Sequence, residues 1–167
     1  MTDLVREITQ FGRPGSLRRI PTSLNGLMES CLALAQARVA GKEIRVGLQL
    51  DPALPQAALD PREIQKAFLN LIVNALEAME AGETLTLRTR RAERGFVEAA
   101  AEDTGCGMTE ETRTRAVDLF FTTKDSGIGF GMAIARTVVE RHGARMDFRS
   151  QLGRGTQVRV LLPLEAP

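Results

Sequence analysis

The sequence predicts an α+β fold, a two-layer sandwich in which a mixed, mainly antiparallel sheet packs against helices. Strand-like segments follow one another in pairs across short turns, and helix-like segments with apolar faces lie between the pairs. A chain of 167 residues with 43% hydrophobic content is long enough for one domain with a sizeable core. We therefore expect a single domain, and the sequence contains no internal repeat.

The first 50 residues contain helical and extended segments in alternation. Apolar residues recur at helical spacing until the glycines and proline of "GRPG" interrupt them, and Ser23 is a suitable N-cap for a helix that stops at Gly41. The stretch "EIRVGLQL" alternates apolar and polar residues as a half-buried strand does. In order, we expect the end of a helix over 1–11, an extended stretch over 20–22, a helix over 24–40 and a strand over 43–50.

The next helix is unusual because two asparagines interrupt an almost wholly apolar run, "AFLNLIVNALEAM" at residues 67–79. Asp60 supplies an N-cap and Pro61 the first helical position. On a helical wheel, Asn70 and Asn74 share a narrow polar strip beside a broad apolar face. An amide is costly to bury without partners, so this strip faces either solvent or a polar cavity, and the helix alone leaves both alternatives open.

The second half of the chain predicts four strands and one helix. "TLTLRTR" and "GFVEAAAED" form a pair of antiparallel strands, and "RMDFRS" and "TQVRVLLPL" close the chain as two more. In order, we expect strands over 84–90 and 95–103, a polar segment without regular structure, a helix over 129–142 and the two closing strands.

Charge and cysteine content argue against several classes of function. Lys and Arg total 22 against 21 Asp and Glu, so no overall charge attracts the chain to nucleic acid or to a membrane surface. Cys31 and Cys106 stand in no metal-binding or redox spacing and favour a reducing, cytosolic compartment. No stretch approaches the ~20 apolar residues of a spanning helix, and we expect no signal peptide and no direct membrane contact. One basic cluster fits a solvated hairpin better than a phosphate-backbone site; it consists of Arg88, Arg90, Arg91 and Arg94.

Two glycine motifs carry the first chemical signals. "EDTGCGM" places Asp103, Gly105 and Gly107 at a strand end, where a sharp turn can bring backbone against a flat ligand and the carboxylate can accept from an amino group. "SGIGFGMAIA" opens a helix with three glycines, and the unpaired amide groups of a helix start can bind phosphate. Lys124 precedes this motif with a positive charge. Each motif is weak when taken singly.

Five motifs in order resemble a known family. "NLIVNA", "DTGCGM", "LFFTTK", "GIGFGMAIA" and "GRGTQV" resemble the N, G1, F, G2 and G3 boxes of sensor histidine kinases, which share the Bergerat-type ATP-binding fold with gyrase, Hsp90 and MutL. The resemblance extends from about Thr22 to Leu164, and "FFTTK" resembles the nitrogen-regulation subgroup. It implies a remnant of the second dimerisation helix and a linker over 1–15, followed by an ATP-binding catalytic domain over 16–167.

The resemblance also implies roles for individual residues. Asn74 would coordinate the Mg²⁺ that bridges the ATP phosphates, with Asn70 beside it as a second metal-site residue. Asp103 would accept from the exocyclic amine of adenine, and Thr156 would lie near the same ring. Asn70 and Lys124 are the expected catalytic residues. Further nucleotide contacts are expected from Gly105, Gly107, Phe121, Thr123, Lys124, Gly127, Gly129, Phe130, Gly131 and Met132.

Asn70 bears on the choice between a kinase and a hydrolase. In ATP-hydrolysing members of the superfamily, the residue one turn before the metal-binding asparagine is a glutamate that activates water, and an amide cannot act as a general base. The resemblance therefore implies phosphoryl transfer to a separate acceptor, with an ATP hydrolase or a non-catalytic nucleotide-binding interaction module as alternatives.

The acceptor histidine is not expected in this chain. The only histidine, His142, ends the predicted 129–142 helix, where a helix-end histidine favoured by the dipole is a better interpretation than a phosphoacceptor. We expect ATP and Mg²⁺ as cofactors, a histidine-bearing dimerisation domain as partner and a response regulator receiver domain as an indirect partner. The expected location is the cytoplasm, including the cytosolic part of a membrane-bound sensor.

Overall fold

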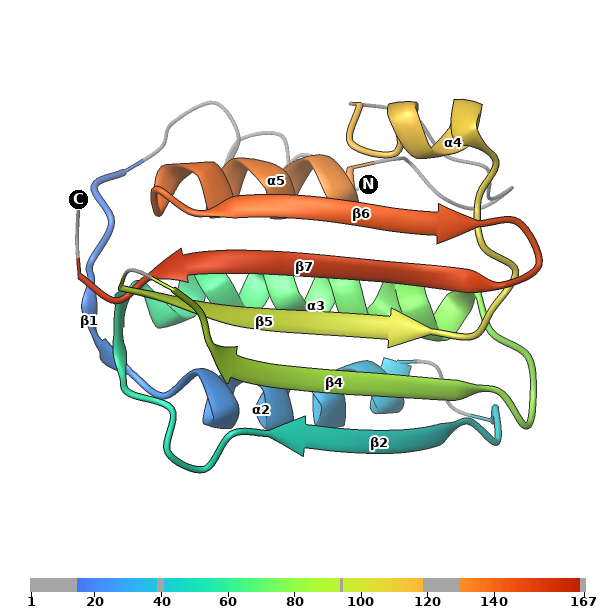
Figure 1. Ribbon diagram of the computed structural model, residues 1–167, viewed down its shortest axis with the longest axis horizontal. Coiled ribbons are helices and arrows are strands. Elements are labelled where there is room, and N and C mark those ends of the chain that lie inside the picture. Colours follow the sequence, from blue (N-terminus) through green and yellow to red (C-terminus); the bar gives the residue numbers. More distant parts are fainter. Residues whose placement is uncertain (1–14, 39–40, 94, 119–129, 166–167) are drawn as a thin grey trace.

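A computed structural model describes residues 15–38, 41–93, 95–118 and 130–165 of the chain. Figure 1 shows its helices and strands. The helices are α2 (Leu24–Arg38), α3 (Pro61–Glu77), α4 (Glu110–Arg115) and α5 (Gly131–Arg141). The strands are β1 (Ile20–Thr22), β2 (Arg45–Leu50), β3 (Ala57–Leu59), β4 (Thr84–Arg91), β5 (Phe96–Asp103), β6 (Arg145–Gln151) and β7 (Gly155–Pro163).

Five of the strands form one mixed sheet in the order β2-β4-β5-β7-β6. The β2–β4 pair is parallel and the other three pairs are antiparallel. Helices α2, α3 and α5 lie side by side on one face of this sheet (Figure 1). The predicted α+β sandwich with a mainly antiparallel sheet is therefore confirmed.

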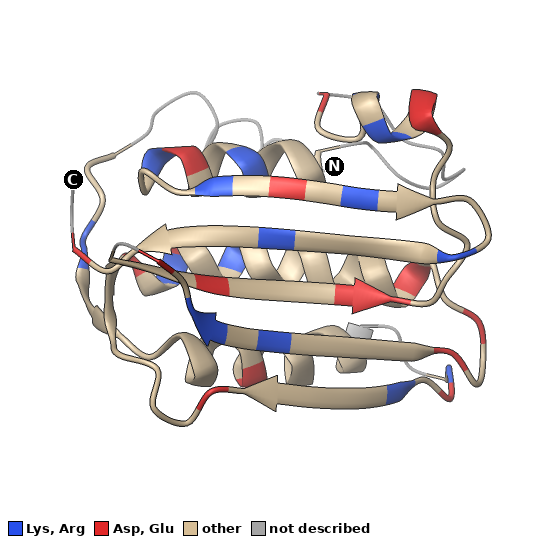
Figure 2. Ribbon diagram, viewed as in Figure 1, with Lys and Arg blue, Asp and Glu red and all other residues tan. Residues whose placement is uncertain are grey.

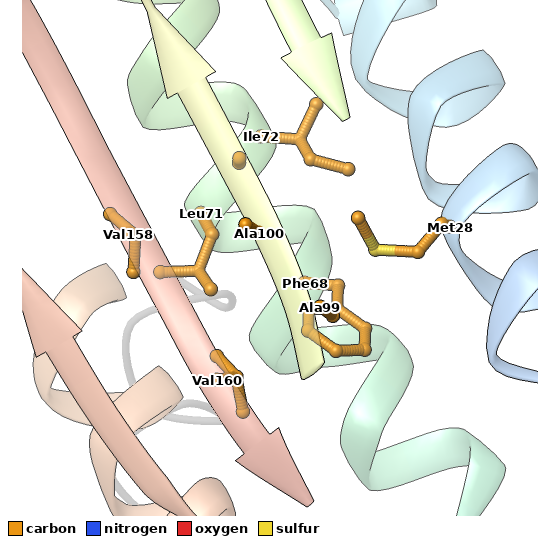
Figure 3. A pocket seen from close by; sticks show the side chains of 9 residues that line it. Met28, Phe68, Leu71, Ile72, Ala99, Ala100, Val158 and Val160 are labelled. Carbon is orange, nitrogen blue, oxygen red and sulfur yellow. The ribbon is translucent and has the colours of Figure 1, made fainter. Parts of the chain in front are cut away.

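The core lies between the sheet and the three helices, with α3 at its centre. Alternate residues of the strands point into it, and the buried ones include Leu85, Leu87, Val97, Ala99, Val160 and Leu162. A cavity of about 10 Å³ remains between α2, α3, β5 and β7, lined by apolar side chains such as Met28, Phe68 and Leu71 (Figure 3). None of its lining residues is a predicted site residue, so this cavity is a small packing defect of the core.

The strands of the sheet also carry charged residues, which Figure 2 marks along the ribbon. Arg90 forms a two-pronged ion pair with Glu98 at 2.8 and 2.9 Å, and Glu98 is only 5% exposed although it points away from the helices. The hydrogen bond from Arg90 lowers the pKa of Glu98. Arg88 donates to Gln49, so two members of the predicted basic cluster have partners on this sheet, while Arg94 lies outside the described residues.

Two elements were not predicted. Strand β3 has three residues and pairs with β1 in a separate small sheet, so it is too short to show an alternating pattern. Helix α4 lies in the polar segment for which the sequence predicts no regular structure. Its N-cap Thr109 accepts from the Thr112 N–H at 3.2 Å, and it buries no residue, so it has no apolar periodicity to detect.

Residues just before α2 are attached to the body of the domain at the start of α3 and the end of α5. The Arg18 N–H donates to Asp60 Oδ2 at 2.9 Å, and Arg19 donates to the carbonyl of Arg141 at 2.9 Å. The predicted dimerisation-helix remnant over 1–15 falls almost wholly outside the described residues and stays a prediction. Within the described ranges, every helix is too short or too polar to span a membrane.

Candidate functional site

Helix α3 places the two asparagines at the edge of the core. Its N-cap is Asp60, whose Oδ1 accepts from the N–H groups of Arg62 and Glu63 at 3.1 and 3.3 Å, as the sequence predicts. The apolar face is buried, including Ile64, Ala67, Phe68, Leu71, Ile72, Ala75 and Leu76. Asn70 and Asn74 are half-buried and stand one helical turn apart.

Asn70 lies against the first residue of α5. A Cβ atom at Gly131 would be 3.5 Å from Asn70 Oδ1, a normal contact distance, and the Asn70 side chain makes no hydrogen bond within the described part of the chain. Helix α5 starts after Phe130 with no hydrogen bond from a capping side chain. The first N–H groups of a helix have no partner within the helix itself, and this junction brings the amide of Asn70 close to the start of α5.

Asp103 is the most strongly organised residue of the site. It ends β5, is 5% exposed and lies opposite Thr156 of β7. Its Oδ1 accepts from the N–H of Gly105 at 3.0 Å and from the N–H of Thr156 at 3.2 Å. Its Oδ2 makes no hydrogen bond among the described residues. One oxygen therefore fixes the carboxylate, and the other can accept from a ligand.

The charge of this carboxylate is poorly solvated. Burial raises the pKa of Asp103, the two backbone hydrogen bonds oppose that rise, and the nearby carboxylates of Glu83 and Glu102 add to it. An ionised Asp103 is thus costly to the empty domain, and a hydrogen-bond donor from a ligand would relieve that cost.

The glycines after Asp103 allow three backbone segments to pack without space for a side chain. A Cβ at Gly105 would come within 2.4 Å of the Ala78 carbonyl oxygen at the end of α3, and a Cβ at Gly107, where φ is +64°, within 2.0 Å of the Gln151 carbonyl oxygen. The Cys106 N–H donates to the same Ala78 oxygen at 3.1 Å. The sequence predicts that these glycines approach a ligand, whereas the contacts that require glycine here are with backbone.

Three contributors to the site were missed by sequence reasoning. Gly155, with φ of +96°, leaves room for Asp103, because a Cβ there would meet the Asp103 carbonyl oxygen at 1.9 Å. Ser150 hydrogen-bonds both Thr156 and the N–H of Met108. Lys42 Nζ donates to the Met79 carbonyl at 2.8 Å and lies near two further carbonyls at the end of α3. Only Gly155, within the quoted "GRGTQV" motif, carried a signal that could have identified it.

The two ends of the site are separated along α3. Ala78, against which Gly105 packs, and Asn70, against which Gly131 packs, are eight residues apart, or about 12 Å along a helix axis. Phe130 is buried and Met132 is half-buried against the core, both at the start of α5. Several predicted site residues lie outside the described residues, namely Phe121, Thr123, Lys124, Gly127 and Gly129.

His142 has a structural position that the sequence predicted only in part. It caps the end of α5 as expected, with Nδ1 2.8 Å from the Val138 carbonyl oxygen. However, it is 1% exposed, and burial lowers its pKa. The prediction that a charged His142 interacts with the helix dipole is therefore wrong. Because Nε2 accepts the Asp60 N–H at 3.0 Å, the ring is neutral with its proton on Nδ1. Neither nitrogen is available to a phosphoryl group.

A family model of ATP-binding domains matches the part of the chain that contains the predicted site residues. The family model described as "Histidine kinase-, DNA gyrase B-, and HSP90-like ATPase" matches residues 59–166, a range that contains every site residue predicted from the sequence. The chain belongs to this family of ATP-binding domains, as the resemblance of its five motifs predicted.

Two curated relatives are named as a sensor protein and a sensor histidine kinase. The chain is 32% identical over 162 residues to the sensor protein FixL of Bradyrhizobium diazoefficiens, covering 96% of this chain and 32% of FixL. It is 30% identical over 161 residues to the sensor histidine kinase ZraS of Klebsiella oxytoca, covering 96% of this chain and 35% of ZraS. The chain thus spans about a third of the length of these relatives. They do not confirm the predicted nitrogen-regulation subgroup.

Solved structures support the fold. Full-length ShkA in complex with AMPPNP matches with a TM-score of 0.87 and 24% identity, covering 99% of this chain and 36% of ShkA. The catalytic domain of the histidine kinase ThkA matches with a TM-score of 0.79 and 21% identity, covering 89% of this chain and 97% of that domain. At these identities the matches establish the shared fold, a five-stranded mixed sheet packed on helices.

Proposed function

We propose that this chain is the ATP-binding catalytic domain of a two-component sensor histidine kinase. In this proposal it transfers the γ-phosphoryl group of ATP to a histidine on a separate dimerisation domain. The observation that carries the proposal is the Asp103 carboxylate, whose Oδ1 is held by two backbone N–H groups while Oδ2 remains for a ligand. The name of one relative, the sensor histidine kinase ZraS, supports the same conclusion.

The adenine end of the site is assigned to Asp103, Thr156 and the glycines of the G1 turn. A fixed carboxylate oxygen accepts from the exocyclic amine of adenine but would repel the carbonyl at the same position of guanine, so ATP is preferred over GTP. Gly105 keeps the turn close to the end of α3, and Gly107 keeps it close to the end of β6, so the turn holds this acceptor at a fixed distance from the asparagines.

The phosphate end is assigned to the asparagine strip and the start of α5. The amide oxygens of Asn74 and Asn70 fit a hard cation that keeps several of its waters, because Mg²⁺ prefers oxygen ligands. When bound, Mg²⁺ supplies positive charge that neutralises the phosphates. We propose phosphate contacts from the backbone of Gly127, Gly129 and Gly131, with charge neutralisation by Lys124. Phe121, Thr123, Phe130 and Met132 complete the proposed contact set.

Asn70 favours transfer over hydrolysis. It lies beside the start of α5, where a hydrolase would need a general base, and its amide cannot take a proton from water. Its proposed catalytic role is to orient the metal and phosphates. His142 is buried with both nitrogens engaged, which supports an acceptor histidine elsewhere. We propose that it lies on a dimerisation domain and that a response regulator receiver domain is reached through that phosphohistidine.

A cytoplasmic location is part of the same proposal. Both cysteines are free thiols: Cys31 is buried, which raises its pKa to about 11, and Cys106 is exposed in the G1 turn. An exposed thiol beside a nucleotide site persists best in a reducing compartment.

Two measurements on the intact chain test the proposal. Calorimetric titration should show Mg²⁺-dependent ATP binding, and adding a histidine-bearing dimerisation fragment with labelled ATP should give an acid-labile, base-stable phosphohistidine on that fragment. If the chain alone hydrolyses ATP at steady state and Asn74→Ala abolishes this activity, the chain is a hydrolase and the kinase proposal is wrong. If the chain binds no nucleotide, both enzymatic functions are excluded and a non-catalytic interaction module is the remaining alternative.

A further inference from the structure

Ser150 joins three segments around the adenine end of the site. It lies on β6, paired with Thr156 of β7, and its side chain is half-buried. Its Oγ is 2.8 Å from the Met108 backbone nitrogen, 3.1 Å from the Gly155 carbonyl oxygen and 2.8 Å from Thr156 Oγ1. The family resemblance and the proposed ligand contacts assign no role to this hydroxyl.

The three contacts determine the direction of each hydrogen bond. A serine hydroxyl has one donor hydrogen and two acceptor lone pairs. The Met108 N–H can only donate, so it occupies one lone pair. The Gly155 carbonyl can only accept, so it takes the Ser150 hydrogen. All three contacts are hydrogen bonds only if the Thr156 hydroxyl donates to the second lone pair of Ser150.

This arrangement defines the polarity of Thr156. With its hydrogen directed to Ser150, Thr156 Oγ1 presents only lone pairs to anything else that approaches it. Its backbone N–H is also committed, because it donates to Asp103 Oδ1. Thr156 and Asp103 are opposite each other on neighbouring strands, so two acceptors and no donor from this pair remain at that end of the site.

We propose that Ser150 is a specificity-determining positioning residue that makes Thr156 a pure acceptor, so that the site selects a purine with an amino group at its six-position. This inference rests on the proposed nucleotide-binding function. Ser150 does not touch the base; it acts through Thr156. A purine with a carbonyl at that position meets acceptors from both Asp103 and Thr156, with no donor to satisfy it.

The test compares ATP with inosine triphosphate, which carries a carbonyl in place of the six-amino group and a hydrogen on the neighbouring ring nitrogen N1. In Ser150→Ala, the Thr156 hydroxyl is released and can donate to that carbonyl. We expect the ratio of the two dissociation constants, inosine triphosphate over ATP, to fall about threefold to tenfold, the effect of one neutral hydrogen bond. Ser150→Thr keeps the hydroxyl and should keep the parent ratio.

The Ser150→Ala substitution made in a Thr156→Val variant distinguishes the change in nucleotide preference from a loosening of the turn. Ser150→Ala also removes the partner of the Met108 N–H, but a looser turn weakens both nucleotides by the same factor and leaves the ratio unchanged. In a Thr156→Val background, Ser150→Ala should therefore not change the ratio. If the alanine variant does not fold, Ser150→Cys provides the same comparison, because a thiol is a weak hydrogen-bonding group.

Each outcome decides the inference. A lower ratio in Ser150→Ala that disappears in the Thr156→Val background supports it. An unchanged ratio, or the same change in both backgrounds, overturns it while leaving the proposed function intact, provided the parent chain binds ATP. A parent that binds both nucleotides equally also overturns it, and a parent that binds neither overturns the proposed function as well.

Discussion

His142 Nε2 accepts the backbone N–H of Asp60 at 3.0 Å, so the residue that ends α5 is bonded directly to the residue that begins α3. The two residues are 82 positions apart in the chain. Because the bond requires a lone pair on Nε2, protonation of the ring must break it. The groups that influence this ring are Arg19, Asp60 and Arg141, together with the Val138 carbonyl.

Acid should therefore weaken the fold through His142. Its pKa is lowered by burial in the folded chain, while an exposed histidine titrates near ~6.5, so the unfolded state binds more protons over the interval between them. The stability contribution is complete above about pH 6.5 and is lost as the pH falls toward the folded pKa. Urea unfolding at a series of pH values measures this slope. His142→Gln, a neutral side chain with an acceptor, should flatten it, and an unchanged slope would assign the acid sensitivity to other groups.

Asp103→Asn should weaken ATP binding without lowering the stability of the fold. The amide oxygen can still accept from Gly105 and Thr156, but a donor replaces Oδ2, so ATP binding should weaken by about 1.5–3 kcal/mol. Burial raises the pKa of Asp103, which means that its ionised form destabilises the empty domain at neutral pH, and the amide removes that cost. Calorimetry and thermal unfolding should show weaker binding with an equal or higher midpoint. Glu102→Gln, next to it on the opposite face of β5, is the matched control, and tight binding by Asp103→Asn would reject the adenine assignment.

Asn74→Ala should remove the Mg²⁺ dependence of ATP binding. A carboxylate is still an oxygen ligand, so Asn74→Asp should keep more metal affinity than the alanine variant, although its charge repels the phosphates. The comparison is the ATP dissociation constant with and without Mg²⁺ in each variant. Equal Mg²⁺ dependence in the parent and in Asn74→Ala would exclude Asn74 from the metal site.

Asn70→Glu should raise ATP hydrolysis. The parent chain alone should hydrolyse ATP scarcely above buffer, whereas a general base that reaches the attacking water typically contributes about 10²- to 10⁴-fold. Phosphate release at steady state measures the change. Asn70→Ala controls for loss of the amide, and adding Asn74→Ala to the glutamate variant should abolish the gain. Rapid hydrolysis by the unmodified chain would contradict the role given to Asn70.

Gly107→Ala should destabilise the fold far more than Gly153→Ala. Both glycines have positive φ, which costs a side-chain residue roughly 1–2 kcal/mol. Only Gly107 faces a carbonyl oxygen, which would lie 2.0 Å from an added Cβ, whereas Gly153 has open space around it. We expect Gly107→Ala to cost at least about 2 kcal/mol more in urea unfolding. Equal losses would show that the backbone contact relaxes easily.

Local sequence signals predicted most of the fold. The N-caps Ser23 and Asp60 were identified because each precedes a helix and accepts from N–H groups close in sequence. The long strands were identified because one face of each is buried against helices, which imposes alternation. Strand β3 and helix α4 were missed because neither is long enough to establish a period.

The site was less predictable because much of it depends on contacts between distant segments. The five motifs predict Asp103 and the asparagines as site residues, but no local pattern indicates that Ser150 bonds the Met108 N–H 42 positions away, or that Lys42 caps α3. The same holds for His142. The sequence predicts its position at a helix end, whereas its neutral state depends on a partner 82 positions earlier.

The turn after β5 packs against the turn between β6 and β7, so neither turn can be replaced independently of the other. The Gly153 N–H donates to the Cys106 carbonyl at 2.7 Å, and neither Gly107 nor Gly155 leaves space for a side chain between the turns. A chimera that imports one turn from a related kinase would bring a surface shaped for a different neighbour. Segments 103–109 and 150–156 should therefore be transplanted together, and their lengths should change together when such domains are recombined.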